Sequence, residues 1–302
     1  VLGLGCENNT MDSFKELLGP VDSSRVKFLV AQESEDEIAD AKKLMSEIAE
    51  TMKADRRESV PMSKLVVGFK CGGSDGLSGI TANPLVGHFC NALTAMGGTG
   101  ILTEVPEMFG AEQMLMNRAV TEEIFNKTVK MVQDFKHYFT AHGQVVYENP
   151  SPGNKAGGIS TLEDKSLGCV QKGGRAPVTS VLGYGDRVSE PGLTLLSGPG
   201  NDIVSTTDMT AAGAHMILFT TGRGTPLGAP VPTVKIATNH NLALHKKDWI
   251  DFDASPMLTE DPGKVTDDLI KFIISVADGE EHTKNEINGY SEISIFKDGV
   301  VL

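Results

Sequence analysis

A thiol, a carboxylate and two hydroxyls lie close together in the stretch 64–83, KLVVGFKCGGSDGLSGITAN. Cys71 ends a short apolar run, and Ser74, Asp75 and Ser78 follow it among glycines. The run is typical of a buried strand, and the glycine-rich residues after it are typical of a loop. In an open α/β sheet, ligands bind at the carboxyl ends of the strands. We therefore predict that this loop belongs to an active site; the alternative is a turn that only reverses the chain.

Cysteines and glutamates stand in other loops of the same kind. Cys6 follows the first predicted strand, Glu104 and Glu107 follow a later one, and Cys169 lies in a glycine-flanked loop. The carboxyl ends of parallel strands meet at one edge of a sheet, so these groups are expected to lie near Cys71. Thiolates are soft ligands and carboxylates hard ones, and a mixed set suits iron better than magnesium or calcium. The sequence thus predicts a metal site; the alternative for each cysteine is a small buried side chain.

Three side chains are candidates for proton transfer. Lys155 and Lys172 lie in glycine-rich loops, and either would act as a base if burial or neighbouring cations lowered its pKa. Otherwise they are solvated lysines. His215 directly precedes an apolar strand, where a histidine can be structural or catalytic. The sequence does not choose among the three.

Polar side chains in these loops are candidates for binding a polar substrate. Arg223 stands between two glycines after a strand, and its guanidinium matches a carboxylate with two parallel hydrogen bonds. The rest of the predicted set consists of hydroxyl, carboxylate and amide groups: Ser74, Asp75, Asn154, Thr225 and Asn239.

Strands and helices must hold these loops at one edge of the molecule. Short apolar runs predict strands near 1–4, 26–31, 65–69, 101–103, 178–181, 193–196, 216–220, 234–237, 249–252 and 293–296. Helical periodicity and helix-ending residues predict helices near 10–18, 34–55, 84–96, 106–118, 121–141, 161–167, 206–213 and 265–277. Strands alternate with helices almost throughout, which predicts an α/β fold with a mainly parallel sheet covered on both faces.

Two local features refine this prediction. Asn83 is expected to cap a helix that has Pro84 at its first position. The stretch 149–160, NPSPGNKAGGIS, has too many prolines and glycines for a helix. No linker or internal repeat is evident, so a single domain over residues 1–302 is expected.

Composition excludes several classes of function. The chain has 302 residues, with 40% hydrophobic and 22% charged residues, as in a soluble globular protein. Its formal net charge is −13, and it has no basic stripe that could neutralise phosphates, so a nucleic-acid or anionic-membrane partner is not expected. No apolar run is long enough to span a membrane, and no signal peptide is evident.

Several known motifs are absent. The four cysteines are widely spaced and form no CxxC pair, which argues against a zinc ribbon or a redox motif. The glycine-rich loops match neither a dinucleotide fingerprint nor a P-loop, which argues against nicotinamide and ATP chemistry.

Long and rare motifs give the chain a specific resemblance. They include GLGCENN (3–9), KCGGSDGLSGITANPLVG (70–87), LTEVPEMFGAEQMLMNR (102–118), YENPSPGNKAGGISTLEDKSLGC (147–169), FTTGRGTPLG (219–228) and DWIDFDA (248–254). On these motifs the chain closely resembles the altronate/galactarate dehydratase family over essentially its whole length, and EMFGAE and DWIDFDA favour the altronate branch. Ser255 stands where the family usually has glycine.

The resemblance implies a cytoplasmic hydro-lyase with a Rossmann-like catalytic domain that needs Fe²⁺, or Mn²⁺ as an alternative. It implies dehydration of a sugar acid, D-altronate to 2-dehydro-3-deoxy-D-gluconate; galactarate, another sugar or sulfo acid, and a non-catalytic binding fragment are alternatives. The implied chemistry is proton abstraction beside the carboxylate, with a metal stabilising the negative charge. The chain would be the carboxy-terminal part of a longer protein that carries an amino-terminal β-clip domain, and a homodimer is left open.

The resemblance also leaves two metal arrangements open. One is a single ferrous ion held by Cys71 with Glu104 as its oxygen partner. The other is a cubic iron–sulfur cluster held by Cys6, Cys71 and Cys169, since such clusters are held by thiolates. We favour the single ion, because the family is described as requiring simple ferrous or manganous ions.

Overall fold

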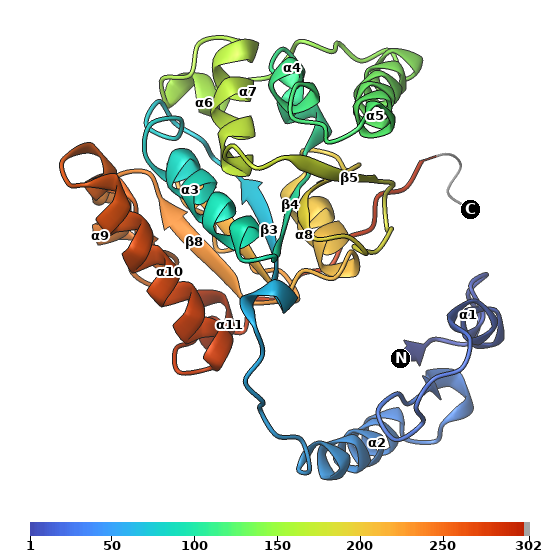
Figure 1. The fold of residues 1–302 in the computed structure, drawn as a ribbon. Coiled ribbons are helices and arrows are strands. Elements are labelled where there is room, and N and C mark those ends of the chain that lie inside the picture. The colour runs from blue at the N-terminus through green and yellow to red at the C-terminus, as the bar shows by residue number, and fades with distance from the viewer. Residues whose placement is uncertain (299–302) are drawn as a thin grey trace. The chain divides into compact units, whose positions relative to one another are not determined.

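A computed structural model describes residues 1–298 of the chain. The chain divides into two compact units, Val1–Val60 and a second that begins at Pro61 (Figure 1). Sequence analysis found no linker, so this division was not predicted. That residues 1–302 form one catalytic domain stays a prediction.

The first unit is a small βα arrangement. Strand β1 (Leu2–Gly3) pairs in parallel with β2 (Leu29–Val30), and helices α1 (Met11–Leu18) and α2 (Glu37–Met52) follow the two strands. A short 3₁₀ turn, η1 (Ala31–Glu33), lies between β2 and α2. None of residues 1–60 is buried. This unit therefore has secondary structure at the predicted places but no core of its own.

The second unit is built on a seven-stranded sheet in the order β5-β6-β4-β3-β7-β8-β9, in which every pair is parallel. The strands are β3 (Val66–Cys71), β4 (Thr99–Leu102), β5 (Val178–Leu182), β6 (Gly192–Leu196), β7 (Met216–Thr221), β8 (Thr233–Ala237) and β9 (Phe252–Asp253). The parallel α/β prediction is confirmed. In β3, β4, β7 and β8 almost every residue is buried, as expected of strands that helices cover on both sides.

Helices lie on both faces of this sheet. They are α3 (Ala82–Ala95), α4 (Glu112–Met116), α5 (Glu122–Ala141), α6 (Pro152–Ala156), α7 (Leu162–Val170), α8 (Asp202–Ala211), α9 (His240–His245), α10 (Pro262–Asp278) and α11 (Lys284–Asn288). The 3₁₀ turns are η2 (Met62–Lys64), η3 (Val105–Met108), η4 (Gln171–Gly173) and η5 (Ser255–Leu258).

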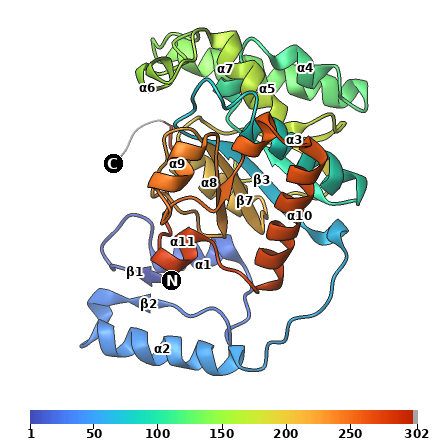
Figure 2. The same cartoon turned by 90° about the vertical axis from the view of Figure 1, so that its left-hand side faces the viewer.

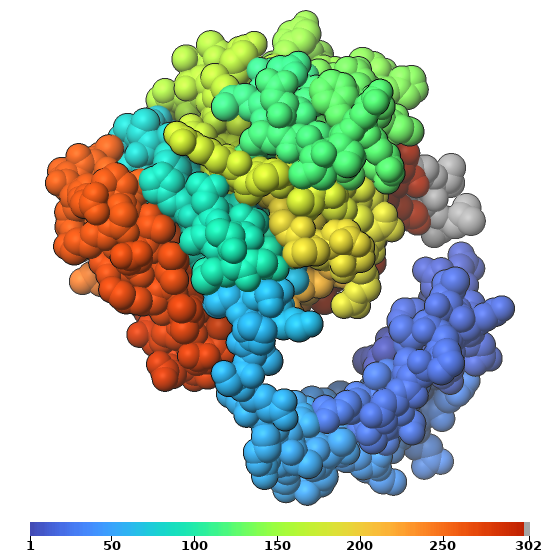
Figure 3. Space-filling model, viewed as in Figure 1, coloured from blue at the N-terminus to red at the C-terminus, as the bar shows by residue number. Residues whose placement is uncertain are grey.

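The two faces have separate cores. Phe69 of β3 packs against Phe89 of α3 on one face, and Met209 of α8 packs with Ile217 of β7 on the other. Figures 1 and 2 show α3 and α10 on the first face and α8 on the opposite one. In the space-filling view, α3 lies between α10 and the segment around η4 (Figure 3). Helices therefore pack on both faces of the sheet and fix the positions of the carboxyl ends of its strands.

Three local predictions were wrong. Thr81, not Asn83, precedes the first turn of α3; the Asn83 side chain instead accepts a hydrogen bond from Thr220 Oγ1 at 2.7 Å. The stretch 149–160 contains helix α6, because Ser151 caps it and a proline is tolerated at the first helical position. No strand forms at 293–296, which the structure describes as irregular.

Helix lengths also differ. The predicted helix 106–118 is divided into η3 and α4, with Gly110 at φ +86° between them. The predicted helix 161–167 continues to Val170 as α7.

Within the described residues, no helix is both long and apolar enough to cross a membrane.

Candidate metal centre and active site

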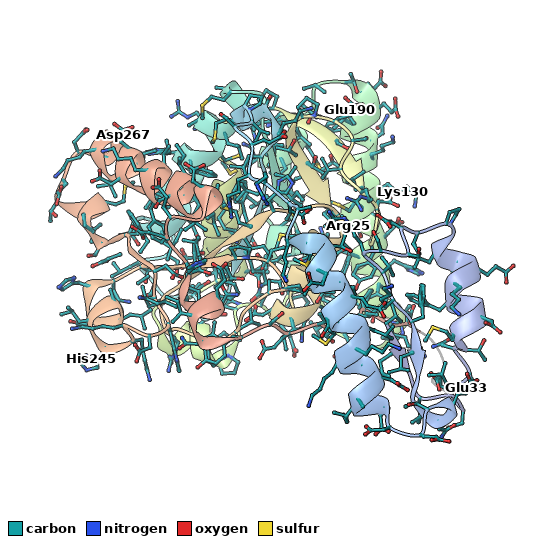
Figure 4. All side chains as sticks on the ribbon, turned by 90° about the horizontal axis from the view of Figure 1, so that it is seen from below. Arg25, Glu33, Lys130, Glu190, His245 and Asp267 are labelled. Atoms are coloured by element: carbon teal, nitrogen blue, oxygen red, sulfur yellow. The ribbon has the colours of Figure 1, made fainter. Side chains whose placement is uncertain are left out.

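Three lysines are buried at the carboxyl ends of β3 and β4. Most charged side chains of this unit point outward, as Lys130 and Asp267 do in Figure 4. By contrast, Lys70 and Lys172 are 0% exposed and Lys165 is 4% exposed. Buried cations are stable only when anions or oxygen atoms surround them. Their partners therefore identify the chemistry of the site.

Two free thiols meet among these lysines. Cys71 is the last residue of β3 and Cys169 lies in the last turn of α7. Their Sγ atoms are 3.3 Å apart, both side chains are buried, and no disulfide joins them. Cys169 was assigned to a loop from the sequence; because α7 continues past Leu167, it lies instead on a helix.

Glu107 completes a group of three possible metal ligands. One ligand atom each from Cys71, Glu107 and Cys169 lies within 4.8 Å of the others. Glu107 belongs to η3, and Asn149 Nδ2 donates a hydrogen bond to its Oε2 at 2.9 Å. Sequence analysis named Glu107 among the hard ligands but chose Glu104 as the oxygen partner.

Glu104 has a different role. It caps η3 in a left-handed conformation at φ +66°, which is uncommon for a residue other than glycine. Its carboxylate pairs with Lys70, accepts hydrogen bonds from Lys172 Nζ and Cys71 N, both at 3.1 Å, and lies 3.7 Å from Cys71 Sγ. Burial and the Cys71 thiolate raise the pKa of Glu104 to about 7, although Lys172 and Lys70 act in the opposite direction. The structure therefore places Glu104 between lysines and outside the group of three ligands.

Lys70 connects this carboxylate to the start of α8. Its Nζ lies 2.7 Å from Asp202 Oδ1 and donates to the Cys71 carbonyl at 2.6 Å. Burial alone would lower the pKa of Lys70, but Glu104 and Asp202 together outweigh burial and hold the pKa above its usual value. Lys70 is thus a fixed positive charge beside Cys71.

Lys172 is also held in its charged form. Burial opposes the charge, but Cys71 and Glu104 raise the pKa of Lys172 above its usual value. The condition under which Lys172 would act as a base, a lowered pKa, is not met in the structure described. Lys172 can therefore stabilise negative charge, but it is not poised as a base.

The two thiols differ in charge. A hydrogen bond from Cys169 and the nearby charges of Lys165, Lys172 and Lys70 hold the pKa of Cys71 well below its usual value, although burial opposes this. The same hydrogen bond and burial raise the pKa of Cys169. The neighbouring lysine charges thus favour a thiolate within this pair of thiols.

A cavity of about 220 Å³ opens beside Lys165 and Cys169. The glycine-rich loop after β3, residues 72–81, is called the central loop and forms one wall, and α7 forms another. Ser74 Oγ is buried and has no hydrogen-bond partner among the described residues. Asp75 also lines the cavity, but its carboxylate is already engaged by Thr238 Oγ1 at 2.9 Å and Asn239 Nδ2 at 3.2 Å. Of the two, Ser74 is therefore the one free to bind a ligand.

The other predicted polar residues surround the central loop. Asn154 Nδ2 donates to the Ser74 carbonyl at 2.9 Å, and Arg223 Nη1 donates to the Gly153 carbonyl at 3.2 Å. Lys155 is exposed on α6, next to Asn154. Thr225 accepts a hydrogen bond from Leu227 N at 3.3 Å within its own loop. The structure therefore gathers most of this set near the loop but does not place Lys155 in the buried centre.

One predicted residue of the second unit, His215, lies at the opposite edge of the sheet from the centre. His215 Nδ1 accepts a hydrogen bond from Val66 N at 3.0 Å. Because Val66 begins β3 and His215 precedes β7, this contact lies at the amino ends of the strands, and the histidine is structural here. Cys6 is exposed in the first unit, where Gln32 Nε2 contacts its Sγ at 3.4 Å. Its part in a metal site stays a prediction.

Sequence analysis missed Lys70, Lys165 and Asp202. Lys165 and Cys169 are four residues apart, which on a helix places them one turn apart on the same face. That signal was available, but the helix was predicted to end before Cys169. Lys70 is a lysine inside an otherwise apolar strand, which is a second usable signal.

Two family profiles of known proteins match the chain. Residues 62–301 match the family profile described as D-galactarate/altronate dehydratase, C-terminal. Residues 1–53 match the profile described as D-galactarate dehydratase/altronate hydrolase, second domain. The boundary between the two matches falls close to the division of the structure at Val60.

Curated relatives agree with these profiles. The whole chain is 56% identical to altronate dehydratase of Bacillus subtilis (strain 168) and 54% identical to altronate dehydratase of Escherichia coli (strain K12), and it covers 61% of each. It is 34% identical to galactarate dehydratase (L-threo-forming) of Escherichia coli over 98% of the chain and 59% of that protein. The chain thus spans about three fifths of the length of the curated relatives it matches.

Proposed function

Because the chain belongs to the D-galactarate/altronate dehydratase family, we propose that the protein containing it dehydrates a sugar acid. The proposed reaction converts D-altronate to 2-dehydro-3-deoxy-D-gluconate and water. The observation that carries the proposal is the buried group of Cys71, Glu107, Cys169 and Lys165 beside a cavity at the carboxyl ends of the strands. Ligands bind at this edge in open α/β sheets.

Altronate is favoured over galactarate on sequence identity. The chain is 56% and 54% identical to two altronate dehydratases, but 34% identical to the galactarate enzyme. Galactarate is therefore the second candidate substrate.

Cys71, Glu107 and Cys169 would hold the metal ion. Two sulfur atoms and a carboxylate oxygen form a mixed set that suits ferrous iron, with manganese as the alternative. Two buried thiols with a carboxylate favour a single ion, whereas a cubic cluster would need a third thiolate such as Cys6. When bound, the ion would supply positive charge where negative charge develops beside the substrate carboxylate.

The chain's own residues would bind the substrate and move protons. Arg223 is exposed next to the central loop and would bind the substrate carboxylate with its planar fork. The free Ser74 hydroxyl would bind a substrate hydroxyl in the cavity. Lys172, held charged, would stabilise the negative charge that develops in the site. Lys155, exposed on the neighbouring helix, stays the candidate base.

Two broader expectations remain part of the proposal. A cytoplasmic location fits an enzyme that needs reduced thiols. The small molecule is proposed as the partner, with no nucleic acid or membrane, because the net charge is −13. A homodimer is left open.

The proposal is tested by assaying the intact protein, purified without oxygen and supplied with Fe²⁺ or Mn²⁺. We expect a 2-keto acid to form from D-altronate and a smaller rate, if any, from galactarate. The isolated chain is assayed beside it, since a non-catalytic binding fragment is one alternative. Formation of no keto acid from D-altronate by the metal-loaded intact protein would contradict the proposed reaction.

A further inference from the structure

We propose that the Lys165 ammonium group occupies the place of the metal ion in the apo protein, and that metal binding displaces it into the neighbouring cavity. The inference rests on the metal site proposed above. It assigns Lys165 a role as an internal counter-ion that competes with the metal.

The contacts of Lys165 carry the inference. Its Nζ lies 3.4 Å from Cys71 Sγ, 3.0 Å from Cys169 Sγ and 2.5 Å from Glu107 Oε2. These are the same three residues that form the candidate ligand group. One cation therefore already satisfies all three metal ligands at once.

The spacing of the ligand atoms fits an ion at the same point. A tetrahedral ion with bonds of about 2.0–2.3 Å separates its ligand atoms by roughly 3.3–3.8 Å. The two Sγ atoms are 3.3 Å apart, and Cys169 Sγ is 3.5 Å from Glu107 Oε2. A metal would need only small movements of these side chains, but it cannot share the space with the ammonium group.

The cavity beside Lys165 can receive its side chain. A second void is lined by Glu104, Glu107, Cys169 and Lys172. It is too narrow to admit a water molecule, so the ammonium groups of Lys165 and Lys172 cannot move into it. The cavity of about 220 Å³ is lined by Lys165 itself and by the acidic residues Asp75 and Asp164. A flexible lysine side chain can turn into it and keep a negative charge nearby. Lys70 and Lys172 cannot substitute, because both are paired with Glu104.

The first test measures metal affinity at one fixed pH with Co²⁺, whose thiolate absorption band reports cysteine ligation. Lys165→Met removes the charge but keeps an unbranched side chain, and we expect it to bind Co²⁺ at least about tenfold more tightly, because a repelling cation is gone. Lys165→Arg keeps the charge and should not gain affinity. Lys172→Met is the matched control: it removes an equally buried lysine that acts on Cys71 through its charge but is hydrogen-bonded to Glu104, so any gain in Co²⁺ affinity should be smaller.

Three outcomes would overturn the inference. They are unchanged or weaker Co²⁺ binding in Lys165→Met, an equal gain in Lys172→Met, and an equal gain in Lys165→Arg. The metal site itself is tested separately with Cys71→Ser and Cys169→Ser. If these variants bind Co²⁺ like the wild type, the proposed centre is wrong; if they lose Co²⁺ while Lys165→Met is unchanged, only the role of Lys165 fails.

A second measurement needs no variant. The intact wild-type protein is treated with an amine-acylating reagent, with and without Co²⁺, and labelled lysines are located by mass spectrometry. Lys165 is 4% exposed and should be protected without metal and labelled with it, while Lys70 and Lys172 stay protected in both. Equal protection of Lys165 in both states would contradict its displacement.

Discussion

The second unit buries ionisable groups in two different ways. At the carboxyl ends of β3 and β4, three lysines lie among carboxylates and a thiolate, and each lysine has an anionic partner. Asp208 of α8 and Lys235 of β8 are also buried, but neither forms an ion pair with another described residue. The first group is a charged centre, and the second consists of isolated groups.

For the three buried lysines of the centre, the anionic partners outweigh burial in setting the direction of the pKa shift. Burial raises the pKa of Asp208 to about 7, although its Oδ1 accepts one hydrogen bond from Gly185 N at 2.8 Å. Its Oδ2 has no hydrogen-bond partner among the described residues. Burial lowers the pKa of Lys235, whose Nζ donates to the carbonyls of Thr225 and Leu227 at 3.2 and 2.8 Å. In the centre, opposite charges reverse this effect for the lysines. A protein therefore keeps buried charge only where it assembles both signs, as a site for polar chemistry requires.

The largest expected effect comes from removing the thiolate of the charged centre. Cys71→Ser in the intact protein should lose bound metal and lower activity at least about a thousandfold, equivalent to about 4 kcal/mol, because serine is a poor ligand. Metal content and D-altronate turnover are the measurements. For the wild type we expect about one metal ion per chain and no acid-labile sulfide.

The matched control is Cys90→Ser, since Cys90 is fully buried in the apolar core away from the ligands. It should lose stability but keep metal. If acid-labile sulfide and about four irons per chain are found, the site holds an iron–sulfur cluster and not a single ion. Normal metal content and turnover in Cys71→Ser would mean that the central loop is only a structural turn.

A smaller effect is expected from breaking the charge balance at Glu104. Glu104→Gln keeps the shape but leaves Lys70 and Lys172 without their shared anion. We expect the free energy of unfolding to fall by about 3 kcal/mol, as for other buried pairs that lose one partner. Urea unfolding of the metal-free intact protein measures it.

Glu112→Gln provides the comparison for this variant. Glu112 pairs with Lys136 at 2.6 Å, and their side chains are 20% and 27% exposed. Partial exposure should limit its loss to about 1 kcal/mol or less. If the two variants lose equal stability, burial has not made the Glu104 pairs more important than a partly exposed one.

The smallest expected effect concerns the isolated Asp208. Its pKa is raised to about 7 in the folded protein and is about 4 in the unfolded chain. Its contribution to stability is therefore fully present below about pH 4 and is lost as the pH rises through about 7. Asp208→Asn cannot ionise, so relative to the wild type it should gain on the order of 1 kcal/mol between pH 5 and pH 8.

The measurement is the difference in unfolding free energy between Asp208→Asn and the wild type at the two pH values. Comparing this difference at the two pH values removes any effect of the amide that does not depend on pH. It also removes the titration of other groups, which both proteins share. Asp186 lies close enough to raise the pKa of Asp208, so Asp186→Asn is a control that should shrink but not remove the effect. An identical difference at both pH values would mean that Asp208 is not neutral in the folded state.

Much of the parallel α/β architecture could be predicted, because it follows from local sequence patterns. The apolar runs at 65–69, 216–220 and 234–237 are strands of one parallel sheet, as expected. Cys71 was placed correctly at the end of a strand. Errors came where a local signal was ambiguous: the end of α7 was predicted too early, which hid the spacing of Lys165 and Cys169.

The sequence by itself determined the α/β class, the polar loops after the strands and the presence of soft and hard ligands in them, because each depends on a few neighbouring residues. Only the tertiary structure decided which of these groups meet. Cys71 and Cys169 touch because α7 packs beside the end of β3, and Glu107, not Glu104, joins the group of candidate ligands because the left-handed turn at Glu104 directs its carboxylate between two lysines. These side-chain contacts join residues up to 98 positions apart in the sequence. They depend on strand order and helix packing, which no local sequence pattern encodes.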